Sequence, residues 1–198
     1  DVETVITMLP EGKHSKEVYL GENGIINKVS KYCLLIDCST IDIQTSIEIG
    51  KKALEKGINM IDAPVSGGVM GAQKATLNIM VGGSKEAFDK ALPLLKIMGK
   101  NIFHAGELGS GNGAKICNNI ALGIAMIAAS ESLMLAKRLK IDIKKVHEIM
   151  KSASGNSWPI SVSPPLPGLI DGTPSNNNYR PGFSAGMMSK DLKLAYEC

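Results

Sequence analysis

The stretch GSGNGAKICNN, from Gly109 to Asn119, joins a glycine-rich turn to a long apolar segment with the pattern of a helix. Lys115 and Asn119 are four residues apart, so on a helix they share one face. An ammonium group and an amide on that face could bind one small polar ligand together. The alternative is an ordinary basic residue in a first helical turn, and the rest of the chain has to decide between the two.

The residues before this stretch alternate between short apolar runs and helical patterns. The runs predict strands at residues 5–8, 33–37, 58–62, 77–81 and 101–104. Such alternation predicts an α/β layer with a largely parallel sheet, and strands that are apolar throughout indicate a sheet covered on both faces. Either Ser39 or Thr40 is predicted to cap the helix from Ile41 to about Lys56, and Ser84 is predicted to cap the helix before the last strand.

The residues after the stretch show helical patterns without strands. One long helix is predicted from Gly113 to about Lys140, a second from Asp142 to Ser152, and a third beginning at Met187. The proline-rich segment between residues 154 and 182 predicts irregular chain. We therefore expect an α/β domain followed by an all-helical domain, with the boundary near residues 105–111.

The long helix is also a candidate for a membrane span. Residues 116–136 carry a single formal charge, Glu131, over about the length that crosses a bilayer. Polar side chains such as Asn118 and Asn119 would be costly in lipid, and much of the apolar content is alanine and glycine. We therefore predict no membrane partner and expect a buried helix in the core of the second domain.

Composition excludes several other classes of protein. The formal net charge is only +3 and the lysines are scattered, so nucleic-acid binding is not indicated. The four cysteines form no close metal-type pair, which favours reduced thiols over a disulfide scaffold. The three histidines lie far apart without an HExxH pattern, so we predict no metal site.

A second glycine signal, DAPVSGG from Asp62 to Gly68, directly follows a predicted strand. The Ser66 hydroxyl and the backbone amides of Gly67 and Gly68 could converge on an anion. Ligands of open α/β sheets gather beyond the carboxyl ends of the strands, where this loop would lie. A tight turn without function is the alternative. The chain contains neither a GxGxxG turn nor a P-loop, so the usual pyrophosphate-binding turn is absent from these residues.

Three ordered motifs together resemble the β-hydroxyacid dehydrogenase family. They are DAPVSGG, GSGNGAKICNN and the segment SKDLKLA at residues 189–195, and the resemblance runs over essentially the whole chain. Supporting segments are MLP at residues 8–10, LLIDCSTID at 34–42, IMVGG at 79–83 and SNNNY at 175–179. The resemblance implies a partial Rossmann-like dinucleotide-binding domain at residues 1–108 and a helical substrate and dimerisation domain at 109–198. It implies an excerpt without the glycine-rich βαβ unit and the final helices, which we expect to be inactive alone.

The family's substrate residues are carried over to matching positions. Lys115 matches the catalytic lysine, while Ser66, Gly67 and Gly68 match the substrate loop and Asn119 the substrate-facing amide. The resemblance implies oxidation of (S)-3-hydroxyisobutyrate to methylmalonate semialdehyde, a step of valine catabolism, in a mitochondrial homodimer or homotetramer. Lys115 would take the hydroxyl proton, since a partly apolar pocket favours the neutral amine.

The cofactor implied by the resemblance is NAD. Leu9, Pro10, Thr40 and Lys190 match positions that contact the nicotinamide cofactor in such enzymes. The sequence departs from the family at His14, where close relatives commonly have asparagine after the LP turn. It departs again where Ala75 replaces the glycine that usually ends the loop motif.

Rival interpretations remain open from the sequence. A related reductase acting on tartronate or succinic semialdehyde would use the same groups. A 6-phosphogluconate dehydrogenase is less favoured, because its pattern has histidine three residues after the lysine, where this chain has Asn118. A non-catalytic cofactor-binding or chromatin-interaction module is a rival from another class, and the presence of Lys115 argues against it.

Overall fold

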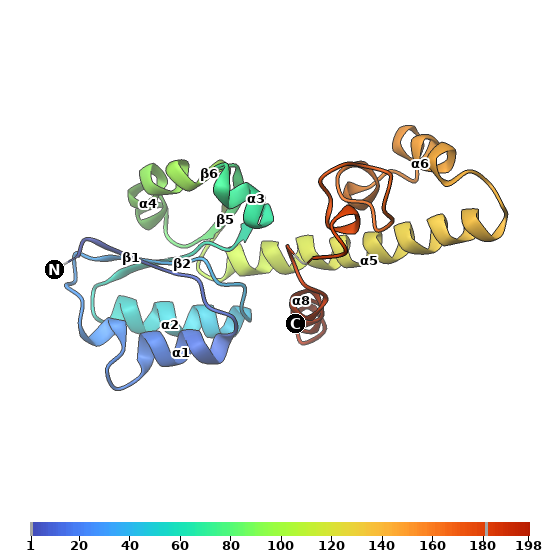
Figure 1. The fold of residues 1–198 in the computed structure, drawn as a ribbon. Helices are drawn as coiled ribbons and strands as arrows, with labels where there is room; N and C mark the ends of the chain where they lie inside the picture. Colours follow the sequence, from blue (N-terminus) through green and yellow to red (C-terminus); the bar gives the residue numbers. More distant parts are fainter. Residues whose placement is uncertain (1, 181) are drawn as a thin grey trace. The chain divides into compact units, whose positions relative to one another are not determined.

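A computed structural model describes residues 2–180 and 182–198. The chain divides into two compact units (Figure 1). The α/β unit comprises residues 1–117 and 193–198, and the helical unit comprises residues 118–192. The division falls inside two helices, so each of these helices contributes residues to both units. The two units are described separately below.

The α/β unit is built on one six-stranded sheet in the order β1-β2-β3-β5-β4, with β6 paired to β5. The strands are β1 (Thr4–Thr7), β2 (Leu34–Asp37), β3 (Asn59–Asp62), β4 (Val65–Ser66), β5 (Leu77–Gly82) and β6 (Gly99–Gly106). The pairs β1–β2, β2–β3 and β5–β6 are parallel, whereas β3–β5 and β4–β5 are antiparallel. The expected largely parallel sheet is therefore mixed, because the predicted strand β5 runs antiparallel to β3 and to the short strand β4, which the sequence pattern did not predict.

Helices cover both faces of this sheet (Figure 1). On one face, α1 (Gly12–Leu20) and α2 (Ile43–Glu55) pack through Tyr19, Ile49 and Ala53 against Leu35 of β2. On the other, α4 (Lys85–Met98) packs through apolar side chains against β2, β3 and β5. Because successive strand residues point to opposite faces, the three apolar residues of β2 supply both cores, Leu34 and Ile36 to one and Leu35 to the other. All four residues of β2 are buried, as the sequence predicted.

The N-cap predicted for α4 is confirmed, whereas the N-cap predicted for α2 is not. Ser84 caps α4 as expected, with its Oγ accepting from Ala87 N–H at 3.1 Å. The prediction that Ser39 or Thr40 caps α2 is wrong, because Asp42 Oδ1 accepts from Thr45 N–H at 2.7 Å. Ser39 is instead drawn into a buried network around the end of β2, described below.

Helix α5 (Ser110–Arg138) is the long helix that the sequence predicted. It is the one helix in the described part of the chain that is long and apolar enough to cross a membrane, a weak signal that core helices of soluble proteins share. The expectation that it is buried is wrong for this chain, since 28% of its most apolar window is buried and side chains such as Ile124 and Ile127 are about 60% exposed. Packing inside the helical unit covers one side, where Ala129 and Leu133 form a core cluster with Ile160.

The remaining elements of the helical unit are short. They are α6 (Ile143–Ser152), α7 (Trp158–Ser161), the 3-10 turn at Pro174–Asn176 and α8 (Ala185–Tyr196), whose last residues belong to the α/β unit. Buried His147 of α6 bonds through Nε2 to the carbonyl of Ile160 at 2.8 Å and so ties α6 to α7. The α/β unit also contains α3 (Gly68–Gln73) and a 3-10 turn at Ile25–Asn27.

Candidate functional site

The start of α5 is held by a carboxylate from the end of β3. Asp62 is buried, and its two oxygens accept from the backbone N–H groups of Gly109 and Asn112, each at 2.7 Å. The first N–H groups of a helix have no partner within the helix, so this carboxylate acts as a cap supplied by a distant residue. Burial raises the pKa of the Asp62 carboxyl, and the bonds from Gly109 and Asn112 oppose that rise.

Asn112 extends the same contact to the segment after β2. Its Oδ1 accepts from Ile41 N–H at 3.0 Å, and its Nδ2 donates to Ser46 Oγ at 2.8 Å. The side chain is fully buried, so both ends of the amide find partners inside the protein, as buried polar groups require. The start of α5 is thereby connected to the end of β3 through Asp62, to the segment after β2 through Ile41 and to α2 through Ser46.

Lys115 follows one turn later on α5 and is 7% exposed. Lysine is rarely this buried unless it is paired. Asn119 lies a further turn along and is also buried. The helical spacing on which the prediction rested is present, because both residues lie within one continuous helix.

Asp191 is a buried partner of predicted site residues that sequence reasoning missed. Within the helical unit its Oδ2 accepts from Asn119 Nδ2 at 2.5 Å, and its Oδ1 forms an ion pair with Lys190 Nζ at 2.8 Å. Asn119 also accepts from Asn118 Nδ2 at 2.9 Å. The carboxylate therefore orients two predicted site residues, Asn119 and Lys190. A buried acidic residue in the middle of SKDLKLA was the available signal.

The predicted substrate loop contains a short strand and a helix rather than a plain turn. Ser66 is half-buried in β4, whereas Gly67 and Gly68 are exposed where α3 begins. Gly67 has φ of +136° and Gly68 has φ of +61°, values that favour glycine. Their missing Cβ atoms leave the backbone open to close approach by a ligand.

Ala75 has φ of +52°, in the left-handed region that glycine ordinarily occupies. The turn between α3 and β5 nevertheless closes, with Thr76 N–H donating to the carbonyl of Gly71 at 2.8 Å. The replacement of glycine therefore leaves the backbone path intact and costs local strain.

The predicted cofactor residues of the α/β unit lie beyond two neighbouring parallel strands. Leu9 and Pro10 follow β1, and Thr40 follows β2, which is paired with β1 in register. Ser39 Oγ accepts from Leu9 N–H at 2.7 Å and donates to Asp37, so the loop of Leu9 is tied to the end of β2. Ligands of open α/β sheets bind beyond the carboxyl ends of the strands, so this edge of the sheet is a position where a ligand can bind.

Asp37 anchors the polar network beneath that loop. Its buried carboxylate accepts from Thr7 Oγ1 at 2.9 Å and from Ser15 Oγ at 3.3 Å. Thr7 is in turn bonded to the Tyr19 hydroxyl at 2.6 Å, and burial raises the pKa of Tyr19 far above its usual range. His14, the departure from the family pattern, is half-buried on α1, and its Nδ1 has no hydrogen-bond partner in the described residues.

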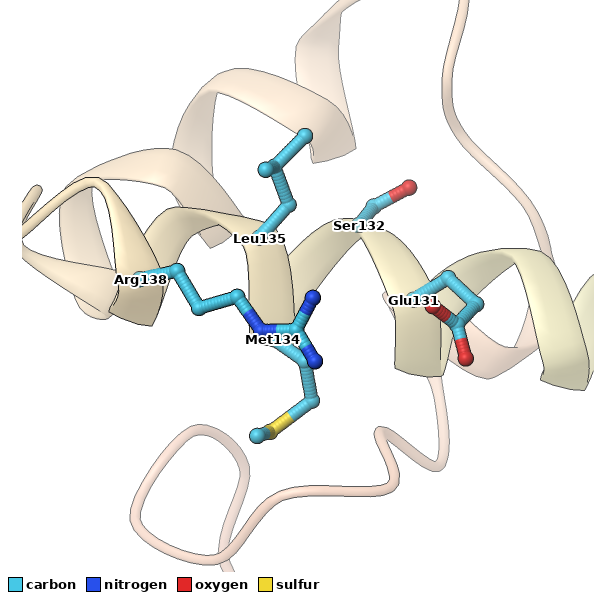
Figure 2. A pocket seen from close by; sticks show the side chains of 5 residues that line it. All are labelled: Glu131, Ser132, Met134, Leu135 and Arg138. Carbon is cyan, nitrogen blue, oxygen red and sulfur yellow. The ribbon is translucent and has the colours of Figure 1, made fainter.

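Hollows in the helical unit do not coincide with the predicted site. The one shown in Figure 2 is lined by Glu131, Ser132, Met134, Leu135 and Arg138, all from α5. A hollow lined by a single helix cannot enclose a ligand, and no predicted site residue faces it. Within residues 2–180 and 182–198, no cluster of three or more His, Cys, Asp or Glu side chains is arranged to hold a metal ion.

Family comparisons match both halves of the chain. Residues 1–106 match the NAD binding domain of 6-phosphogluconate dehydrogenase, and residues 109–198 match the family described as NAD-binding of NADP-dependent 3-hydroxyisobutyrate dehydrogenase. The 3-hydroxyisobutyrate dehydrogenase of Pseudomonas aeruginosa is 46% identical over 193 residues, covering 98% of this chain and 65% of the relative. The mitochondrial enzyme of Rattus norvegicus is 47% identical over 193 residues, covering 98% and 58%.

A solved structure shares the fold over the whole chain. The 3-hydroxyisobutyrate dehydrogenase of Mycobacterium tuberculosis, solved with L-serine, has a TM-score of 0.92 and 38% identity, covering 100% of this chain and 67% of that one. An NAD-dependent L-serine dehydrogenase of P. aeruginosa is also similar, at 43% identity over 195 residues, covering 98% of this chain and 65% of the relative. The chain thus spans about three fifths of the length of the curated relatives it matches.

Proposed function

The chain belongs to the 3-hydroxyisobutyrate dehydrogenase family of NAD-binding proteins, and we propose that its full-length protein oxidises (S)-3-hydroxyisobutyrate to methylmalonate semialdehyde. The observation that carries this proposal is the buried Lys115, one turn beyond a helix start that Asp62 and Asn112 hold. A buried lysine on a rigid element is suited to proton transfer with a small substrate.

In the proposed reaction, Lys115 in its neutral form accepts the hydroxyl proton of the substrate. Leu9, Pro10, Thr40 and Lys190 would hold NAD, which would supply the hydride acceptor needed for the carbinol carbon to become a carbonyl carbon. Ser66 and the amides of Gly67 and Gly68 bind the substrate carboxylate, and Asn119 orients the reacting oxygen. The bond from Asn119 to Asp191 supports that role, because it fixes the rotamer of the amide.

NAD-binding is common to both matched families, and the choice of NAD over NADP is part of this proposal. We assign Leu9, Pro10, Thr40 and Lys190 to the cofactor, and we retain the domain limits 1–108 and 109–198. A role in valine catabolism, a mitochondrial location and assembly as a homodimer or homotetramer are further proposals. Similar relatives include both a bacterial and a mitochondrial enzyme.

L-Serine is a second candidate substrate. A relative is named as an L-serine dehydrogenase, and the similar M. tuberculosis structure was solved with L-serine. Serine shares with 3-hydroxyisobutyrate a carboxylate and a primary alcohol on the β carbon, so the same loop and lysine could act on both. The two molecules differ at the α carbon, which carries an ammonium group in serine and a methyl group in 3-hydroxyisobutyrate.

The test assays the full-length protein against 3-hydroxyisobutyrate, L-serine, glycerate (the alcohol of tartronate semialdehyde) and 4-hydroxybutyrate (the alcohol of succinic semialdehyde), each with NAD and NADP. We expect the largest kcat/KM for 3-hydroxyisobutyrate with NAD. A preference for L-serine would replace the substrate assignment, and inactivity with every pair would favour the non-catalytic module. A preference for NADP would overturn the cofactor choice.

Two variants test the residue roles. Lys115→Met should lower turnover by about 10²- to 10⁴-fold and abolish the rise of the oxidation rate with pH, since no neutral amine remains to accept the proton. Ser66→Ala should raise the KM for substrate by an amount equivalent to about 1–3 kcal/mol, with a smaller change for NAD. Normal turnover in Lys115→Met would remove this lysine from the mechanism.

A further inference from the structure

Three segments that carry predicted site residues meet at one pair of buried side chains in the α/β unit. Asp62 ends β3, four residues before Ser66. Asn112 lies in the first turn of α5, three residues before Lys115, and bonds to the backbone of Ile41, the residue after Thr40. Asp62 and Asn112 are joined to each other by the 2.7 Å bond from Asn112 N–H to Asp62 Oδ2.

The helix start is also pressed directly onto the sheet backbone. A Cβ added at Gly111 would lie 2.4 Å from the carbonyl oxygen of Met80 and 2.7 Å from that of Asp62. A Cβ at Gly82 would lie 2.7 Å from Gly111 N. These distances leave no room for a side chain at Gly82 or Gly111. The backbone of the first turn of α5 therefore packs directly against the backbone of β3 and β5, and the Asp62 carboxylate fixes the position of the helix along these strands.

Resting on the proposed function, we propose that Asp62 and Asn112 are positioning residues for Lys115. They neither touch the reacting atoms nor transfer a proton. They hold the helix that carries Lys115 against the strand end that leads to Ser66 and the segment that carries Thr40. A displacement of about 1 Å at a reacting group can cost about 100-fold in rate, so loosening this attachment should be visible in kcat.

The decisive experiment is a double-mutant cycle in the full-length protein, with Asp62→Asn made alone and together with Lys115→Met. An asparagine keeps the shape of the side chain but turns an NH₂ group toward one of the two backbone N–H donors, so one bond is lost. We expect kcat to fall by about 10- to 100-fold in the otherwise native protein. In the Lys115→Met background the further fall should be less than about threefold, because the positioned group is already gone.

The matched control is Ser84→Ala, which removes a bond to a backbone N–H at the start of α4 in the same unit. It should lower the thermal midpoint without lowering kcat. The KM for NAD should change by less than about threefold in Asp62→Asn, which separates loss of positioning from a general loosening of the unit.

Each other outcome overturns the inference. Equal falls in kcat in both backgrounds would show a general structural effect, and an unchanged kcat would show that the attachment does not matter to Lys115. If Asp62→Asn does not fold, Asn112→Ala is judged by the same criteria, and failure of both to fold would assign the pair to stability alone. Normal turnover of Lys115→Met would contradict the proposed function as well as this inference. Equal falls in kcat on introducing Asp62→Asn into the two backgrounds would contradict this inference alone.

Discussion

The strand β2 and the helix α5 are both apolar stretches, but the structure treats them in opposite ways. All four residues of β2 are buried, because α1 and α2 cover one face of the sheet and α4 covers the other. Helix α5 carries Ile124 and Ile127 with about 60% of each exposed. Apolar composition therefore shows which surfaces favour burial. Whether such a surface is buried within this chain depends on which other elements pack against it.

The largest contrast should appear in thiol reactivity. Burial raises the pKa of Cys38, next to β2, to about 12, while Cys117 on α5 is exposed. A buried thiol with so high a pKa carries very little of the reactive thiolate at pH 8, and the reagent reaches it poorly. Peptide mass spectrometry after alkylation with iodoacetamide should therefore find Cys117 labelled much faster than Cys38. Urea should abolish the difference, and equal rates in the folded chain would contradict the burial of Cys38.

Core substitutions provide the next test. Ile36→Ala in β2 should lower the free energy of unfolding of this chain by about 2–5 kcal/mol, because it leaves a cavity in a packed cluster. Ile124→Ala, the matched change on α5, should cost no more than about 0.5 kcal/mol because the side chain is mostly exposed. Urea unfolding followed by circular dichroism measures both. A large loss in Ile124→Ala would mean that this face of α5 is covered in solution.

The N-termini of α5 and α6 are capped in different ways, and a smaller effect on stability is expected from changing the cap of α6. The start of α5 is held by Asp62 from a distant strand, whereas α6 begins at its own cap, Asp142, whose Oδ1 accepts from Lys144 N–H at 2.8 Å. Asp142→Ala should cost about 1 kcal/mol in urea unfolding, and Asp142→Asn should cost much less because it keeps an accepting oxygen. Equal losses in the two variants would show that charge rather than the hydrogen bond matters there.

The smallest expected effect concerns the turn that leads into β5. Ala75→Gly should stabilise the chain by up to about 1 kcal/mol, since glycine adopts φ of +52° without strain. Ala72→Gly, three residues earlier inside α3, should destabilise it by about 0.5–1 kcal/mol. Thermal unfolding of the two variants should therefore move in opposite directions, and a shift of both in the same direction would contradict the assigned backbone.

Local patterns in the sequence predicted most of the elements correctly. The period of the apolar residues placed β1, β2, β3, β5 and β6 and the helices α2, α4, α5 and α6 within a few residues, whereas the short strand β4 was missed. Ser84 was identified as a cap because its partner lies three residues away. Ser39 was not resolved by the same reasoning, because it bonds to Leu9 N–H, which follows another strand, and to the nearby Asp37 carboxylate, and Asp42 caps α2 instead.

The sequence by itself determined the family, the α/β-then-helical order and the position of Lys115 on a helix with Asn119 one turn away. These features depend on residue order and on the fixed periods of helix and strand. Only the tertiary structure decided that β5 runs antiparallel to β3, that Asp62 and Asn112 hold the start of α5, and that Asp191 holds Asn119. Such hydrogen bonds join residues 47 to 72 positions apart, and no local period can encode a contact that forms only when strands and helices pack together.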